Sequence, residues 1–541
     1  MSEAGLGNTK KVFLSGVLLL TLSTLLVKVI GLVYKIPMLS YLGSEGMGYF
    51  NSAYEIYALF CVISTAGLPV ALSVLISGAL ARGERGSVRR IYRAALTVFL
   101  IVGALGSGVM LLFARQFCGL IQSEGAYFSI LAIAPTLFFV CLSSALRGYF
   151  QGYQKMLPTA ISQVIESLGK LVFGLLFARW ALERGYGTAE VSAFAGLGLT
   201  LGTAISFFYL LIEKRRFRPE EEQDVDEALP SLGSIWKRLA KLSIPMTLGA
   251  SLVSLTKLID MAMILRRLQA IGYSEVAANE AYGGYTTLAL SVFGLLPSLV
   301  NAVALPLVPM LSAAIASGDR ERQGEMIRAS YRLTALFAIP AALGVSAFAH
   351  PVLSLLFAGE EQTVAVAAPL LSALGVSVFL SCMITATNSV LHAYQAVNRP
   401  ILSMLAGAVL KIVSAYFLIG NRSVALMGAP ISTFLCDAAV VLLNLYFSER
   451  LCRVSGLGAV FWRPLLAAVL SVGGSYAGYL WLSLRFGASS LLTLAALATA
   501  VFSYLIISCF TGVFEEQDLL ALPMGEVLCK ILKKLRLLPQ C

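Results

Sequence analysis

Charged residues are scarce in this chain of 541 residues. Lys, Arg, Asp and Glu make up 13% of the sequence and hydrophobic residues 58%, whereas a soluble globular domain carries about 25% charged residues. The apolar residues gather into blocks of about 20, the length that a helix needs to cross a hydrocarbon core of about 30 Å. The composition therefore excludes an ordinary soluble domain and predicts an all-α integral membrane protein with many spans.

Residues that support metal, redox or hydrolytic chemistry are also few. The chain has two histidines and nine cysteines, and no two cysteines have the C-x-x-C spacing of a zinc or redox site. Neither an H-E-x-x-H motif nor a phosphate-binding P-loop is present. We therefore expect no metal, no cofactor and no enzymatic activity. The net charge of +11 is interpreted as anchoring at the cytoplasmic membrane surface and not as a nucleic-acid site.

The apolar blocks give about fourteen predicted transmembrane helices. They cover residues 12–34, 50–79, 91–113, 126–148, 158–180, 188–212, 240–264, 283–312, 331–350, 363–391, 401–419, 424–447, 463–484 and 488–510. With the N-terminus in the cytoplasm, most of the 40 Lys and Arg residues fall in cytoplasmic segments, as the positive-inside rule requires. The sequence therefore predicts a multi-pass protein of the cell membrane with both termini in the cytoplasm.

The second half of the chain echoes the first in the same order. The matched segments are Lys28-Val29-Ile30 with Lys257-Leu258-Ile259, Gly67-Leu68-Pro69-Val70 with Ala304-Leu305-Pro306-Leu307, Tyr92-Arg93 with Tyr331-Arg332, Leu146-Arg147-Gly148-Tyr149 with Leu391-His392-Ala393-Tyr394, and Pro158 and Lys170 with Pro400 and Lys411. Parallel repeats of this kind are typical of transporters. We interpret the chain as two parallel six-helix repeats followed by two added helices.

The repeat and the charge pattern divide the chain into five parts. These are an N-terminal six-helix bundle (1–212), a cytoplasmic linker with an acidic middle (213–239), a C-terminal six-helix bundle (240–447), two additional transmembrane helices (448–512) and a cytoplasmic amphipathic tail (513–541). The tail alternates apolar and basic residues, as a helix lying on the inner membrane surface does.

Ionisable side chains inside the apolar blocks mark the candidate site. A charged group at the centre of a membrane helix costs about 2.5–3.5 kcal/mol, so we expect these groups to line a polar cavity or to pair with one another. The basic candidates for substrate binding are Lys28, Lys35, Lys170, Lys257, Lys411 and Arg147. The acidic candidates, as counter-ions or for ion coupling, are Glu166, Asp260 and Asp437. The matched prolines Pro69 and Pro306 are candidate hinges.

Helical spacing leaves two interpretations of these charges open. Glu166 lies one turn before Lys170, and Lys257 lies one turn before Asp260, so each pair shares a helix face. Such pairs either hold the bundle together as intramembrane salt bridges or line a cavity for an anionic substrate. Lys28 and Lys411 have no acidic residue one turn away, which favours a substrate or pathway role for them.

Three motifs together resemble a known family. The most specific reads Leu-Arg-Gly-Tyr-Phe-Gln-Gly over residues 146–152 and continues through Pro158 and Glu166. The others are Gly43-x-x-Gly46-x-Gly48 and Gly67-Leu68-Pro69-Val70-Ala71. Over roughly residues 10–510 the chain resembles the MOP exporter superfamily (multidrug, oligosaccharidyl-lipid, polysaccharide). It is most similar to the polysaccharide-flippase branch, which contains sporulation proteins and Gram-positive lipid II flippases.

This resemblance implies a V-shaped pair of bundles around a central cavity, alternating access and a lipid-linked, pyrophosphate-bearing sugar as substrate. Membrane lipids are further expected partners, a monovalent cation is a candidate for coupling, and we expect a monomer. It also implies basic residues in the first and seventh spans, where Lys28, Lys35 and Lys257 fall. The relatives commonly use arginine there, whereas lysine is a point charge without the bidentate fork of arginine. The lysines therefore keep the positive charge that the family pattern requires, without the bidentate geometry of arginine.

Three other functions stay open as alternatives. A cation-coupled multidrug exporter of the same superfamily should have an acid-dominated cavity, whereas lysines outnumber acids here. A membrane glycosyltransferase or polymerase would need catalytic carboxylates or a large outside loop. A non-transporting scaffold for cell-wall or spore assembly would keep its function when Lys28 and Lys257 are neutralised. The sequence leaves the sugar, the coupling ion, and a vegetative or sporulation role undecided.

Overall fold

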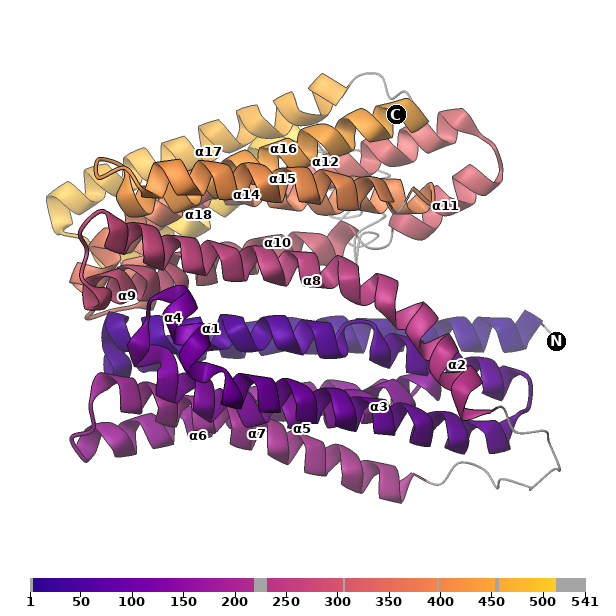
Figure 1. Cartoon of the computed structure of the whole chain (residues 1–541). Coiled ribbons are helices and arrows are strands. Elements are labelled where there is room, and N and C mark those ends of the chain that lie inside the picture. Colours follow the sequence, from indigo (N-terminus) through magenta and orange to yellow (C-terminus); the bar gives the residue numbers. More distant parts are fainter. Residues whose placement is uncertain (1–2, 218–230, 305–306, 397, 453–456, 512–541) are drawn as a thin grey trace. The chain divides into compact units, whose positions relative to one another are not determined.

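Helices are the regular structure throughout the described residues of the computed structural model, which are 3–217, 231–304, 307–396, 398–452 and 457–511 (Figure 1). The first half contains α1 Glu3–Thr65, α2 Leu68–Ala81, α3 Arg85–Leu112, α4 Ala114–Ile121, α5 Tyr127–Gly152, α6 Leu157–Glu183, α7 Thr188–Arg216, α8 Leu232–Ala270 and α9 Glu275–Gly284. The second half contains α10 Leu290–Ala304, α11 Leu307–Ala316, α12 Arg320–Ala347, α13 Ala349–Leu356, α14 Glu361–Ala393, α15 Asn398–Ile419, α16 Gly428–Leu451, α17 Leu457–Phe486 and α18 Ser490–Phe510.

Twelve stretches of the described residues are long and apolar enough to cross a membrane. The first of them, Leu22–Ala81, is 60 residues long and holds the second predicted span together with part of the first. The predicted span at 283–312 falls on α9, α10 and α11, and residues 305 and 306 within it lie outside the described ranges. The predicted all-α membrane fold is confirmed, and the number of spans stays approximate.

The long helix α1 is a hairpin that reverses at Gly43. Gly43 has φ +65° and ψ 177°, a backbone conformation that essentially only glycine adopts. The rings of Tyr34 and Phe50, on either side of it, have centroids 6.2 Å apart. A straight helix would separate these two residues by about 24 Å, so the two arms of α1 lie side by side.

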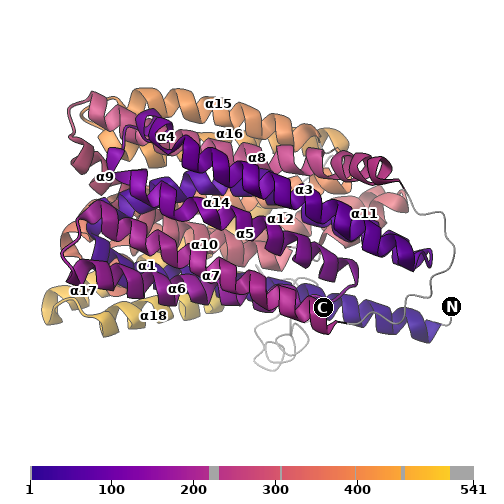
Figure 2. The same cartoon turned by 60° about the horizontal axis from the view of Figure 1, so that its bottom comes forward.

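Contacts divide the chain into two compact units, Met1–Gly283 and Gly284–Cys541. In the first unit α1, α5, α6 and α7 pack against one another, and α3 lies along α5 (Figures 1 and 2). Glycines bring α6 and α7 together, because Gly169 faces Gly202 and Gly174 faces Gly198 with their backbones in contact. Small residues allow membrane helices to approach in this way.

Helix α8 packs with the first unit, along α1, α2 and α3. Trp236 on α8 donates a hydrogen bond from its Nε1 to the backbone oxygen of Ala94 on α3, at 3.3 Å. Gly67 leaves room for the backbone of Ser243 to approach. The repeat assigns the same segment to the start of the bundle at 240–447, so contacts and the repeat divide the chain at different points. The middle of the predicted linker at 213–239 and the whole predicted tail at 513–541 lie outside the described residues.

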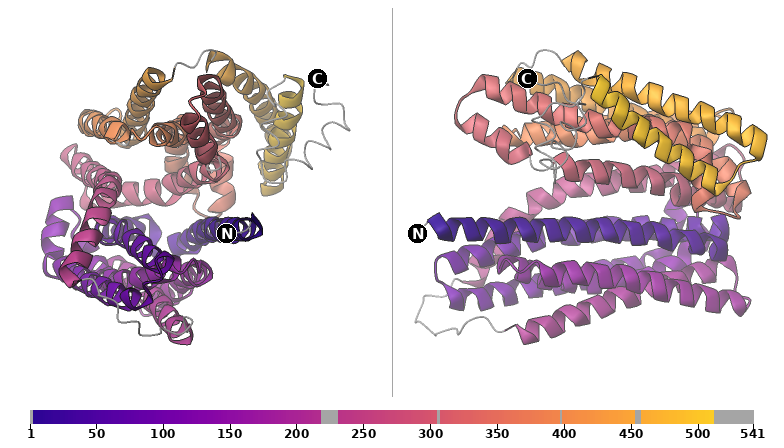
Figure 3. Two further views of the ribbon diagram at one scale, coloured as in Figure 1. Left: turned by 90° about the vertical axis from the view of Figure 1, so that its right-hand side faces the viewer. Right: turned by 180° about the vertical axis from the view of Figure 1, so that it is seen from behind.

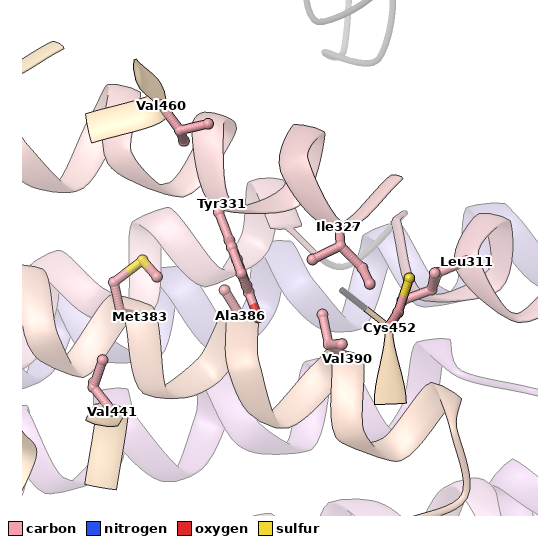
Figure 4. Packing of buried hydrophobic residues seen from close by; sticks show 9 residues of the cluster. All are labelled: Leu311, Ile327, Tyr331, Met383, Ala386, Val390, Val441, Cys452 and Val460. Atoms are coloured by element: carbon pink, nitrogen blue, oxygen red, sulfur yellow. The ribbon is translucent and has the colours of Figure 1, made fainter. Parts of the chain in front are cut away.

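The second unit has its own buried core. Side chains from α11, α12, α14, α16 and α17 meet there, among them Tyr331, Met383 and Val441 (Figure 4). Helices α17 and α18 pack together, and α17 lies on α12 (Figure 3). The two added helices are therefore covered on one side by the second repeat.

The order and lengths of the helices agree with the predicted repeat, and the helix ends correct one of its matched segments. Helix α3 has 28 residues and is followed by α4 with 8, and α12 and α13 have the same two lengths. Tyr153 ends α5 before Gln154 at φ +57°, and Tyr394 ends α14 before Gln395 at φ +58°.

Tyr394 is thus equivalent to Tyr153, and the match of Tyr149 with Tyr394 is wrong by one helical turn. Residues one turn apart lie on the same helix face and give similar patterns, which explains the error. In the corrected register Lys170 follows Gln154 by the same number of residues as Lys411 follows Gln395. The two lysines therefore stay equivalent.

Candidate functional site

Lysines from α1 and α8 come together within the first unit. The ammonium groups of Lys28 and Lys257 repel each other, and Lys257 also acts electrostatically on Lys35. Lys28 and Lys257 are exposed, whereas Lys35 is half-buried. Three of the predicted substrate-binding lysines thus form one group, although their sequence positions lie in two different repeats.

Glu55 completes this group, and the sequence analysis did not select it. Glu55 lies on the returning arm of α1, where it attracts both Lys35 and Lys257. Its signal in the sequence is a lone carboxylate close to the start of a predicted span, where it resembles an interfacial residue. The hairpin at Gly43 brings it back beside Lys35, a contact that hydropathy alone does not predict.

Asp260 lies one turn after Lys257 on α8 and also acts electrostatically on Glu55. The group therefore holds three ammonium groups (Lys28, Lys35 and Lys257) and two carboxylates (Glu55 and Asp260), with a net charge of one positive when all are ionised. We call these five residues the lysine cluster. Such an arrangement can hold an anion against the lysines while the carboxylates balance the charge of the empty site.

Lys170 on α6 lies next to this cluster, and its ammonium group is held by aromatic rings. The Nζ atom lies 4.8 Å from the ring centroid of Tyr34, 4.7 Å from that of Tyr54 and 5.5 Å from that of Phe50. Lys35 repels it, and Glu166 attracts it. Cation–π contacts of this kind are strongest where water is excluded, and Tyr34 and Phe50 are each only 1% exposed.

Arg147 on α5 forms a largely buried ion pair with Glu166 on α6. Its Nη2 donates to Glu166 Oε2 at 2.8 Å, its Nε donates to Ser162 Oγ at 2.9 Å, and Nη2 also reaches Ser206 Oγ at 3.4 Å. The side chains of Arg147 and Glu166 are only 13% and 22% exposed. Glu166 shares a face of α6 with Lys170, as its spacing indicates, yet its carboxylate bonds Arg147 across to α5.

Lys411 and Asp437 belong to the second unit. Lys411 on α15 attracts the Asp437 carboxylate on α16, and Ser381 on α14 donates to Asp437 Oδ2 at 2.8 Å. Lys411 thus has an acidic neighbour on the adjacent helix, which sequence spacing along α15 alone does not indicate.

The candidate hinge Pro69 lies in the first turn of α2, directly after the interruption between α1 and α2. Helix α1 ends at Thr65 and α2 begins at Leu68, so the predicted span at 50–79 consists of two helices. Gly148, within the most specific family motif, touches the backbone of Pro69: a Cβ placed at Gly148 would lie 2.8 Å from the Pro69 oxygen. The matched Pro306 lies outside the described residues.

Comparison with known proteins assigns this chain to a family. A family model described as polysaccharide biosynthesis protein matches residues 13–315, more than half of the chain. The chain belongs to this family. A second model, MatE, matches residues 245–417, and the membership of the polysaccharide-flippase branch of the MOP superfamily that the motifs indicate is confirmed.

Relatives of this chain include two proteins from Bacillus subtilis (strain 168). Stage V sporulation protein B is 25% identical over 95% of this chain and 98% of its own length. Lipid II flippase MurJ is 24% identical over 74% of this chain and 76% of its own length.

Solved structures support the same fold. Lipid II flippase MurJ in an inward closed conformation superposes with a TM-score of 0.69 at 15% identity, covering 91% of this chain and 98% of that one. An inward-facing multidrug resistance MATE family transporter of the MOP superfamily has a TM-score of 0.62 at 14% identity, with 80% and 98% covered. These likenesses concern the fold.

Proposed function

We propose that this protein is a flippase that moves a lipid-linked precursor, a sugar carried on a polyprenyl pyrophosphate, across the cytoplasmic membrane by alternating access. The observation that carries the proposal is the lysine cluster, in which Lys28, Lys35 and Lys257 gather in membrane-spanning helices of one unit. The names of two relatives, a lipid II flippase and a sporulation protein, support the same class of substrate.

The physical basis is the cost of moving a pyrophosphate through a region with little water. An isolated anion in such a place is strongly disfavoured, whereas three ammonium groups offer it opposite charge. Glu55 and Asp260 balance these lysines while no substrate is bound. Net transport then requires that the affinity for the pyrophosphate differ between the inward and outward states.

The contacts of the remaining candidate residues divide them into a structural group and a group for ion coupling. Arg147 is bonded to Glu166, and the ammonium group of Lys170 lies among rings, so we assign these three to the framework of the first unit. Lys411 and Asp437 remain the candidates for coupling to a monovalent cation, in the second unit.

Replacement of single lysines tests the proposal. We expect Lys28→Ala and Lys257→Ala to abolish complementation of a strain that lacks its lipid II flippases, with normal accumulation of the protein in the membrane. Lys28→Arg should retain partial function because it keeps the positive charge. Lys241→Ala is the matched control, since this exposed lysine lies on the same helix as Lys257. Full complementation by both alanine variants would refute the flippase assignment.

The identity of the substrate requires a direct measurement. On depletion of the protein, the precursor that it moves should accumulate with its sugar facing the cytoplasm. Quantifying lipid-linked sugars that are accessible from the inner leaflet, for each precursor the cell makes, identifies the substrate by the one that increases.

A multidrug exporter is the second candidate. The MatE match over residues 245–417 and the additional carboxylate of Glu55 favour it, because acids suit cationic drugs. Increased resistance to lipophilic cations on expression, abolished by Glu55→Gln and retained by Lys28→Ala, would establish this function in place of the first.

A further inference from the structure

Lys170 connects the two arms of the α1 hairpin. Tyr34 belongs to the first arm, and Phe50 and Tyr54 belong to the returning arm. The Lys170 Nζ lies within 5.5 Å of all three ring centroids. A straight helix would hold Tyr34 and Tyr54 about 30 Å apart, so a single ammonium group on α6 bridges segments that the reversal at Gly43 has brought together.

The rings form a continuous group around this ammonium. Phe50 lies between the two tyrosines, with ring centroids 6.2 Å from Tyr34 and 6.3 Å from Tyr54. One turn further along α6, Gly174 leaves room for the Tyr34 ring, because a Cβ placed there would lie 3.0 Å from the Tyr34 hydroxyl oxygen. The first arm of α1 therefore contacts α6 at two successive turns, through Tyr34.

Two of the three bridged rings are next in sequence to a charged member of the lysine cluster. Tyr34 precedes Lys35, and Tyr54 precedes Glu55. Lys35 and Glu55 attract each other across the hairpin. Any movement of Tyr34 relative to Tyr54 therefore changes the separation of that ammonium and that carboxylate.

We propose that Lys170 is a positioning residue that clasps the two arms of α1 through the rings of Tyr34, Phe50 and Tyr54 and so sets the separation of Lys35 and Glu55. Only its consequence for transport depends on the flippase function; the clasp itself does not. The alternative is that Lys170 binds the substrate directly, as the sequence alone suggests. That role would require the ammonium group to leave the rings.

The distance between the two arms tests the clasp without any transport assay. Spin labels at Val33→Cys and Ile63→Cys report on the first and the returning arm, since both side chains are exposed, at 47% and 45%. The labels are placed in the full chain with its other cysteines replaced. We expect a single narrow distance distribution that becomes at least twofold broader or shifts in Lys170→Met and returns in Lys170→Arg, which keeps a cation over the rings.

The chain offers a matched control for the loss of a cation–π contact. Lys155 lies over the ring of Phe217 at 4.0 Å, at the far end of α5 and α7. Lys155→Met should leave the distance between the arms of α1 unchanged. If Lys170→Met does not accumulate, Tyr54→Leu carries the same test. An unchanged distance in Lys170→Met or in Tyr54→Leu overturns the proposal.

A substrate-binding assay distinguishes the proposed clasp from direct binding of the substrate by Lys170. For a clasp, Tyr54→Leu and Lys170→Met should weaken binding of the lipid-linked precursor by a similar factor, and the double variant should be no worse than either. For a direct ligand, Tyr54→Leu would bind as the wild type while Lys170→Met would not, and that result refutes the clasp. If Lys28→Ala and Lys257→Ala both retain full function but the arm distances change as expected, the flippase proposal fails and the clasp stands.

Discussion

The ion pair of Arg147 and Glu166 gives the sharpest test of which charges in this protein are structural. We consider Glu166→Leu, which leaves the Arg147 guanidinium facing Ser162 and Ser206 without its carboxylate. Removal of one partner of a buried ion pair costs about 3–5 kcal/mol. The two side chains are 13% and 22% exposed, so partial hydration places the expected loss at the lower end, about 3 kcal/mol.

That loss corresponds to roughly a hundredfold change in the unfolding equilibrium. It can be measured by reversible unfolding in mixed micelles, with a thiol-reactive dye reporting on the exposure of buried Cys141 on α5. The double variant Arg147→Met, Glu166→Leu removes both charges and should recover most of the stability, because a packed apolar pair replaces a buried ion pair at little cost.

An exposed ion pair within α6, the helix of Glu166, is the control. Arg179 and Glu183 on α6 form a 2.7 Å pair whose side chains are 64% and 61% exposed, and exposed pairs contribute about 0–1 kcal/mol. Glu183→Leu should therefore unfold like the wild type. If Glu166→Leu costs no more than Glu183→Leu, or if the costs of Arg147→Met and Glu166→Leu simply add in the double variant, Arg147 and Glu166 are not a structural pair and Arg147 becomes available for substrate.

Two further predictions concern the first unit. Gly43→Ala should destabilise the protein by about 1–3 kcal/mol, since a residue with a Cβ is strained at φ +65° and ψ 177°. Gly43→Asn should be destabilised as well. The unfolding assay described above measures both variants, and an unchanged stability of Gly43→Ala would show that α1 does not need this reversal. Burial, with Glu124 and Glu275 nearby, raises the pKa of the Cys118 thiol to about 12, so the reactive thiolate is depleted at pH 8 and appears only as the pH rises toward that pKa. In a variant that retains Cys118 alone, alkylation of the folded protein at pH 8 should be about a thousandfold slower than of the unfolded protein, and equal rates would contradict the burial.

The sequence predicted the features that depend on local periodicity. Blocks of apolar residues, basic turns and the order of matched segments are each short-range signals, and they led to the helical membrane fold and to the repeat. The one-turn slip that matched Tyr149 with Tyr394 has the same origin. A helix repeats its face every turn, so a short match cannot decide between neighbouring turns, whereas the left-handed residues Gln154 and Gln395 fix the register.

Charge partners across helices could not be predicted in this way. Spacing along α6 paired Glu166 with Lys170, but the Glu166 carboxylate bonds Arg147 on α5 and the Lys170 ammonium lies among rings of α1. Spacing also left Lys411 without an acid, whereas Asp437 approaches it from α16. Each of these contacts joins two different helices, and a single sequence carries no signal for which helix faces meet.

The omission of Glu55 has the largest consequence for mechanism. Counting only charges deep within predicted spans gives an excess of lysines over acids, which indicates a site that is cationic on balance. With Glu55 beside Lys35 and Lys257, the site holds a further internal counter-ion, which the proposed pyrophosphate substrate must displace or a proton must neutralise. A substrate anion then competes with a tethered carboxylate for the same ammonium groups, and binding is weaker than three lysines alone would give. Weaker binding favours release on the opposite side, which a transporter needs as much as capture.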